Sequence, residues 1–132
     1  MKSDTHFLIV DDYVNIRSLV KNQLSDFGFV QNITEQESAN NAISFLQSHL
    51  GKPVDFIISD WNMPGMTGLE FLKWVRGHQK FKNLPFLILT TENEQAKIMS
   101  AISGGVSNFL IKPWETEEIA NKIQLCWKKH NP

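Results

Sequence analysis

Three features are scarce in this sequence of 132 residues. It has one cysteine, Cys126, so no disulfide bond can form within the chain, which fits a reducing compartment. The N-terminal apolar run extends only from Phe7 to Val10, too short for a signal-peptide core or a membrane span. Charge of one sign is not in excess either, since 13 Lys+Arg stand against 14 Asp+Glu and the net charge is -1. We therefore expect a cytoplasmic protein that binds neither nucleic acid nor a membrane.

The histidines also exclude one class of site. The four histidines lack the spacing of zinc ligands, and nothing around them supports a histidine phosphotransfer role; they are His6, His49, His78 and His130. What the chain does have is a hydrophobic share of 42%, with 11% aromatic residues. A chain of this length and composition buries enough surface for a real core, so we expect a single domain over residues 1–132.

Short apolar runs rich in β-branched residues predict the strands. They are continuous instead of alternating, which is typical of strands covered on both faces of a parallel sheet. The five predicted strands, the second of them the weakest, are Phe7–Val10, Val30–Thr34, Val54–Ser59, Phe86–Thr90 and Phe109–Ile111.

Segments with helical spacing of apolar residues lie between and after these runs. Glycines near their ends, Gly28, Gly51, Gly77 and Gly104, are typical helix stops. The apolar stripes are Ile16, Leu19, Val20 and Leu24; Ala39, Ala42, Ile43 and Leu46; Leu69, Leu72 and Val75; Ile98, Ala101 and Ile102; Ile119, Ile123, Cys126 and Trp127. Strand and helix thus alternate about five times, which predicts an α/β fold: a doubly wound, five-stranded parallel sheet with helices on both faces.

Polar residues gather where the predicted strands end. Asp11 and Asp12 follow the first strand, Asp60 the third, Thr90 and Thr91 the fourth, and Lys112 the fifth. The carboxyl ends of parallel strands share one edge of the sheet, which is also where ligands bind in open α/β folds. We therefore expect these side chains to converge on one site.

Three converging carboxylates repel one another unless a cation lies among them. Few oxygen ligands and no complete protein cage favour Mg²⁺, which keeps waters and accepts phosphate oxygens. Lys112 then supplies a positive charge for an anion in the site, and the Thr90 hydroxyl can donate to that anion. The pattern suits phosphoryl chemistry.

Each residue also has an ordinary structural interpretation. Asp12 could serve only as the N-cap of the first helix, Lys112 could be a surface lysine before a proline, and Thr90 could simply end a strand. We favour the functional interpretation because independent strands each end in the residue type that the site requires.

The motifs "FLIVDD", "ISDWNMPGMTGLEFL", "LILTTE" and "NFLIKPW" occur in this order along the chain. Together they resemble the receiver domain of bacterial response regulators over nearly the whole length. The resemblance is greatest to the stand-alone chemotaxis regulators of the CheY type, which implies a flavodoxin-like, CheY-like fold.

By this resemblance Asp60 is the phosphoacceptor, a carboxylate nucleophile that takes a phosphoryl group from a phosphohistidine on a histidine kinase. The resemblance further implies that Asp12, Asp60 and the Asn62 carbonyl ligate Mg²⁺ directly and that Asp11 acts through water. It pairs Lys112 with the phosphoryl oxygens and makes the bond from Lys112 to Pro113 cis. Trp61, next to the acceptor, is expected beside the metal.

The resemblance also implies a switch. After phosphorylation the Thr90 hydroxyl moves toward the phosphoryl group, and the Phe109 ring fills the vacated space. The expected output surface comprises the fourth helix, the last strand and the last helix, with an apolar patch at Ile98, Ile111 and Trp114. The partners implied are a chemotaxis-type histidine kinase and the flagellar motor switch or another output protein, and the chain is expected to be monomeric.

Four positions depart from the chemotaxis pattern. Phe109 stands where those regulators carry Tyr, and Thr91 stands where a small residue is usual. Glu94 and Gln95 replace lysines near the start of the fourth helix, which disfavours a partner surface chosen for positive charge. The motor switch is therefore an open choice of partner.

Three other hypotheses remain. The chain could be a receiver excised from a longer regulator, a receiver used as a constitutive scaffold, or a phosphatase that forms an aspartyl phosphate. Such phosphatases place a second acid two residues after the nucleophile, and this chain has Asn62 there. We therefore expect a signalling switch with at most slow self-dephosphorylation and no enzymatic turnover of other substrates.

Overall fold

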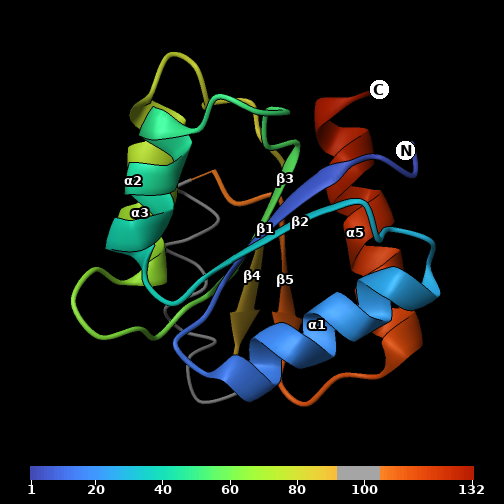
Figure 1. The fold of residues 1–132 in the computed structure, drawn as a ribbon. Helices are drawn as coiled ribbons and strands as arrows, with labels where there is room; N and C mark the ends of the chain where they lie inside the picture. The colour runs from blue at the N-terminus through green and yellow to red at the C-terminus, as the bar shows by residue number, and fades with distance from the viewer. Residues whose placement is uncertain (92–104) are drawn as a thin grey trace.

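A computed structural model describes residues 1–91 and 105–132 of the chain, and Figure 1 shows five parallel strands in one sheet between two layers of helices. The predicted fourth helix, with Ile98, Ala101, Ile102 and Gly104, lies outside the described residues, as do Glu94 and Gln95. The elements are β1 (His6–Val10), α1 (Val14–Asp26), β2 (Asn32–Gln36), α2 (Ala39–Ser48), β3 (Phe56–Asp60), α3 (Gly68–Gly77), β4 (Phe86–Thr90), β5 (Asn108–Ile111) and α5 (Thr116–His130).

The strand order is β2-β1-β3-β4-β5, with every neighbouring pair parallel, so the predicted fold class is confirmed. The order reverses between β1 and β3, and a crevice outside the carboxyl ends of the strands is expected at this point. Asp11 and Asp60 follow or end these two strands. The topology therefore opens the crevice at the predicted site.

Two apolar clusters form the core, one on each face of the sheet. In β1, Leu8 and Val10 pack with α2 and α3, whereas Phe7 and Ile9 pack on the opposite face with α1 and α5. Successive residues of a strand point to opposite faces, so a strand that feeds both clusters must be apolar throughout. This explains the continuous apolar runs of the central strands β1, β3 and β4, whose residues are all buried.

The predicted second strand is displaced by two residues. It begins at Asn32, which pairs with His6, and Val30 lies before it with 60% of its surface exposed. As an edge strand β2 is only half-buried, so its sequence carries little apolar signal and pairing with β1 decides its position. In α1, Leu19 is likewise exposed, although its spacing predicted a core residue.

Capping residues mark the start of α2 and α3, the two helices on the face of the sheet opposite α1 and α5. Ser38 caps α2 by accepting a hydrogen bond from the Asn41 backbone N–H at 3.1 Å. Thr67 and Glu70 form a reciprocal capping box at the start of α3.

Among the described residues, no helix has the length and apolar character needed to cross a membrane.

Candidate functional site

A cavity of about 440 Å³ opens at the carboxyl edge of the sheet. Its lining includes most of the predicted site residues, and the full lining is Asp12, Tyr13, Asp60, Asn62, Met63, Pro64, Thr90, Thr91 and Lys112. The charged lining residues lie at or just after the ends of strands, and the remaining residues come mostly from the loops that follow. The cavity at the carboxyl edge is therefore lined by charged side chains.

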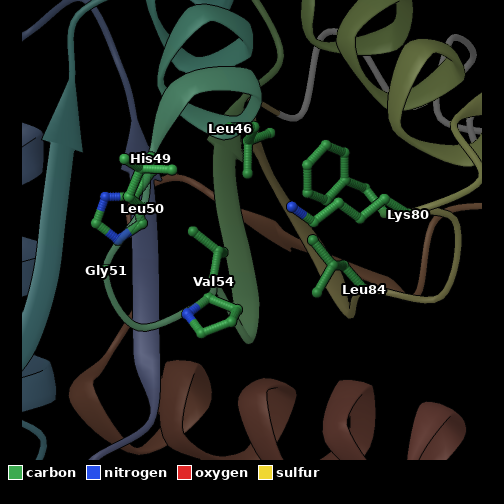
Figure 2. A pocket seen from close by; sticks show the side chains of 9 residues that line it. Leu46, His49, Leu50, Gly51, Val54, Lys80 and Leu84 are labelled. Atoms are coloured by element: carbon green, nitrogen blue, oxygen red, sulfur yellow. The ribbon is translucent and has the colours of Figure 1, made fainter.

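A second cavity, of about 290 Å³, is mostly apolar (Figure 2). It lies below α2, where Leu46, Val54 and Leu84 form its walls and His49 and Lys80 are its ionisable lining residues. It contains no carboxylate. The cavity at the carboxyl edge is therefore the better candidate for the chemistry that the sequence predicts.

Asp60 is the last residue of β3, and only 3% of its surface is exposed. Two donors reach its Oδ1 atom: Lys112 Nζ at 2.8 Å and the Trp61 backbone N–H at 2.9 Å. Among the described residues, no hydrogen bond reaches Oδ2. The carboxylate is therefore held through one oxygen, while the other is left for a ligand.

The chain beyond Asp60 turns back so closely that it requires glycine. Gly68 donates its N–H to the Trp61 carbonyl at 2.9 Å, and a Cβ at position 68 would overlap the Asp60 carbonyl and approach Trp61 Cα to 2.9 Å. Gly65, in the same loop, has φ of 79°, which favours glycine. The "MPGMTG" segment thus carries the sharp return that leaves Asp60 at the mouth of the strand.

Asp11 and Asp12 follow β1 at the same edge. Asp11 is fully buried, and its Oδ1 accepts the Tyr13 backbone N–H at 2.9 Å. Its Oδ2 and the Asp12 Oδ1 are buried without a hydrogen-bond partner. Tyr13, and not Asp12, is the N-cap of α1, so the interpretation of Asp12 as a helix cap is wrong.

Lys112 follows β5 and is the cation of the site. Its ammonium lies 2.8 Å from Asp60 Oδ1 and 3.7 Å from Asp11 Oδ2. Its backbone is anchored, since the Lys112 N–H donates to the Thr90 carbonyl at 2.7 Å. The bond to Pro113 is cis, as predicted. One lysine thus faces two buried carboxylates.

Burial controls the titration of these acids. It raises the pKa of Asp60 to about 6; the Lys112 hydrogen bond opposes this rise, and the Asp11 charge adds to it. Burial is also the main reason that the pKa of Asp11 is raised. A bound cation would lower both values by favouring the charged forms.

The donor set fits a hard divalent cation. One carboxylate oxygen each from Asp11, Asp12 and Asp60 lie within 4.8 Å of one another. One buried oxygen of Asp11 and one of Asp12 lack a hydrogen-bond partner. When ionised, three carboxylates and one ammonium leave a formal charge of about two negative units, which a divalent cation would neutralise. Buried carboxylate oxygens without partners are costly unless a ligand satisfies them.

Comparisons with known proteins show the family of the chain. Residues 7–124 match the family described as "Response regulator receiver domain". The chain belongs to this family. The sequence is 38% identical over 124 residues to a "Chemotaxis protein CheY" of Pseudomonas aeruginosa, which covers 94% of this chain and 97% of that protein. It is 33% identical over 129 residues to "Chemotaxis protein CheY-3" of Vibrio cholerae, covering 98% of this chain and 96% of that protein.

A solved structure is similar to this receiver domain over most of its length. The chemotaxis response regulator CheY4 of Vibrio cholerae has a TM-score of 0.81 and 34% sequence identity, and the match covers 92% of this chain and 98% of that one. The chain is thus homologous to CheY chemotaxis regulators, and receiver domains of this type are signalling switches instead of classical enzymes.

The predicted switch residues of this receiver domain lie on neighbouring strands. Thr90 ends β4 and is 1% exposed, and its hydroxyl donates to the Thr91 carbonyl at 3.4 Å. Phe109 on β5 is half-buried against the cluster beneath α2 and α3, and the Lys122 ammonium lies 5.4 Å from its ring centroid. These positions are consistent with the predicted exchange of space, which remains a prediction.

The predicted output residues are only partly described. Ile111 ends β5 and is half-buried, and Ile98 lies outside the described residues. Trp114 packs against the cluster on the α1 and α5 face and donates its indole N–H to Gln23 at 2.9 Å. Trp61, expected beside the metal, packs in the opposite core cluster with 5% exposure.

Several residues of the site escaped the sequence analysis. Tyr13 and Met63 line the cavity, and Arg17 donates to the Asp11 carbonyl at 2.7 Å while pairing with Glu35 at 3.3 Å. Adjacency to Asp12 was a usable signal for Tyr13. Arg17 lies a full helical turn into α1, and only the pairing of β1 with β2 brings Glu35 to it.

Proposed function

We propose that this receiver domain accepts a phosphoryl group on Asp60 from a phosphohistidine of a histidine kinase in a two-component system. The single observation that carries the proposal is the contact between Lys112 and Asp60, beside two further carboxylates, Asp11 and Asp12, that each keep a buried oxygen without a hydrogen-bond partner. An ordinary buried ion pair needs no extra acids beside it, whereas phosphoryl transfer needs a nucleophile, a cation and a metal-binding set.

The chain's residues have separate tasks in this step. Asp60 Oδ2, which no described hydrogen bond engages, attacks the phosphorus atom while the phosphorus–nitrogen bond of the donor breaks and its electron pair returns to the imidazole. Lys112 stabilises the charge on the phosphoryl oxygens, and the Thr90 hydroxyl donates to one of them in the phosphorylated form. Phe109 then occupies the space that Thr90 leaves.

Mg²⁺ is the proposed cofactor. Asp12, Asp60 and the Asn62 carbonyl would hold it, and Asp11 would act through water. When bound, the ion neutralises the negative charge that gathers as the phosphoryl group approaches the carboxylates.

The proposed output is a protein-binding surface at β5, α5 and the helix predicted around Ile98. Relatives named as chemotaxis proteins favour a chemotaxis-type kinase as donor and the flagellar motor switch as one candidate partner. We also propose that residues 1–132 act as one monomeric domain in the cytoplasm.

A rival function on the same nucleophile is an aspartyl-phosphate phosphatase. Asn62 disfavours it, because the position two residues after Asp60 then lacks the general acid and base that such enzymes use. Repeated turnover of a phosphate monoester by the purified protein would support the phosphatase and contradict the receiver.

Binding of Mg²⁺ and beryllofluoride, a phosphoryl mimic, tests the proposal. Amide NMR shifts and tryptophan fluorescence should respond in the wild type and lose the beryllofluoride response in Asp60→Asn. Asp55→Asn is the matched control, because Asp55 precedes the same strand β3 but pairs with Lys52 at 3.4 Å, at the opposite edge of the sheet. A wild type without a response, or an Asp60→Asn variant that responds normally, would refute the assignment.

A further inference from the structure

Gln23 is a polar residue at a core position of α1. Helical spacing places it with Val20 and Leu24, both fully buried, on the face that packs against the sheet. The Gln23 residue is itself only 5% exposed. A buried amide must find hydrogen-bond partners, so the partners of Gln23 constrain the packing around it.

Both groups of the amide reach the segment that follows Lys112. The Trp114 indole N–H donates to Gln23 Oε1 at 2.9 Å, and Gln23 Nε2 donates to the Thr116 hydroxyl at 3.4 Å. Trp114 lies between β5 and α5, and Thr116 is the first residue of α5. Gln23 therefore ties α1 to residues 114–116.

Trp114 is the inward anchor of this connection. Its ring packs on the core cluster shared by α1 and α5, whereas Pro113 and Glu115 on either side are exposed. Lys112 stands two residues before it, with its backbone N–H on the Thr90 carbonyl. Two contacts thus determine the path of the chain from Lys112 into α5: the hydrogen bond of the Lys112 N–H to Thr90 and the packing of Trp114.

The tie joins two parts of the site that the sheet keeps apart. Asp11 and Asp12 lead into α1 from β1, and Lys112 leads toward α5 from β5, while β3 and β4 lie between these two strands. Figure 1 shows α1 and α5 on the same face of the sheet. Gln23 thus connects α1, which follows Asp11 and Asp12, to Trp114, which follows Lys112.

We propose that Gln23 is a positioning residue that, by holding Trp114, fixes Lys112 against Asp60. The long lysine side chain has many rotamers, so a fixed backbone origin is needed to keep its ammonium at one oxygen. The importance of this placement for anion binding rests on the proposed function, whereas the placement itself can be measured without any ligand.

The test compares Gln23→Leu, Trp114→Phe and the double variant with the wild type by NMR. Gln23→Leu keeps side-chain volume but removes both hydrogen-bonding groups, and Trp114→Phe keeps an aromatic ring but removes the indole N–H. Gln124→Leu is the matched control, because it makes the same change at an exposed position of α5. The readouts are the Trp114 indole N–H resonance, the Lys112 ε-methylene resonances, and affinity for beryllofluoride with Mg²⁺.

In Gln23→Leu we expect the indole resonance to lose its protection from exchange and the Lys112 resonances to move toward those of a freely rotating lysine. Beryllofluoride affinity should fall about three- to tenfold, and affinity for Mg²⁺ alone should stay within about twofold of the wild type. The double variant should show no greater loss than Gln23→Leu alone, because that variant already removes the hydrogen bond that Trp114→Phe removes. Gln124→Leu should match the wild type throughout.

Unchanged Lys112 resonances in a folded Gln23→Leu variant would overturn the inference, as would equal losses of anion and metal affinity. A wild type that binds no beryllofluoride would refute the proposed function, while the ligand-free Lys112 resonances would still decide the role of Gln23. The two failures are therefore distinguishable.

Discussion

Lys112 Nζ lies 2.8 Å from Asp60 Oδ1 although the strands that lead to these residues are not neighbours in the sheet. β4 separates β3 from β5, so the lysine reaches over the end of β4, where Thr90 lies. The contact therefore brings three strand ends together at one point. A change in the charge or size of the Asp60 side chain should therefore affect both Thr90 and Lys112.

The charge on Asp60 should destabilise the metal-free protein at neutral pH. Because burial raises its pKa to about 6 from 3.8, the folded state binds the proton more tightly than the unfolded state. The ionised form thus costs stability above about pH 6, and this cost, on the order of 3 kcal/mol, is relieved as pH falls from 6 toward 4. Asp60→Asn should be more stable than wild type at pH 8, with a difference that shrinks by pH 4.

Urea unfolding without divalent cations measures this difference. Glu37→Gln, which removes an exposed carboxylate, is the control and should differ little from the wild type at either pH. Added Mg²⁺ should stabilise the wild type more than Asp60→Asn. An Asp60→Asn variant less stable than wild type at pH 8 would contradict the prediction.

Thr91→Ala should speed the phosphorylation of Asp60 several-fold. Thr91 is exposed and lines the cavity, so its branched side chain narrows the approach to the carboxylate. Stopped-flow tryptophan fluorescence with a small acyl phosphate donor measures the rate. Thr91→Val keeps the branch and should remain as slow as wild type, and equal rates for Ala and Thr at this position would remove the claim.

Gly68→Ala should destabilise the fold by about 1–3 kcal/mol or more, because a Cβ at position 68 overlaps the Asp60 carbonyl and the backbone must move. Gly77→Ala is the matched control in the same helix α3, since nothing lies within 4 Å of its added Cβ. That substitution should be neutral or stabilising by up to about 1 kcal/mol. Chemical denaturation of both variants checks the pair, and equal losses would show that the close return is not the cause.

Acid should weaken the fold through His130. Its Nε2 lies 2.6 Å from the Ser107 hydroxyl, and its pKa is lowered by burial first and then by the charges of Arg76 and Lys129. The unfolded state therefore binds the proton more tightly than the folded state. His130 does not reduce the stability of the fold above pH 6.5, its ordinary pKa, and reduces it as the pH falls below that value. Between pH 7.5 and 5.5 the wild type should lose more stability than His130→Gln.

Urea unfolding at the two pH values tests this, together with NMR titration of the His130 ring. The ring should titrate below the range of an exposed histidine. A His130→Gln variant with the same loss of stability as wild type would assign the acid sensitivity to other groups.

Much of the fold was predictable because it depends on local patterns. Continuous apolar runs at β1, β3 and β4 reflect burial on both faces, and alternation with helical stripes determines the parallel sheet. The edge strand β2 was displaced from its prediction because its position depends on pairing with His6 and its neighbours, which leaves little trace in its own residues.

The sequence by itself determined which polar residues stand at the strand ends, because each follows or ends a recognisable apolar run. These residues are Asp11, Asp12, Asp60, Thr90 and Lys112. Only the tertiary structure decided which atoms meet. The contact of Lys112 with Asp60 joins residues 52 positions apart, and the hydrogen bond of Trp114 to Gln23 joins residues 91 positions apart. No local pattern in the sequence encodes these contacts, or the buried oxygens of Asp11 and Asp12 that lack a hydrogen-bond partner. Such contacts depend on strand order and helix packing, because these set the distances between elements that are remote in sequence.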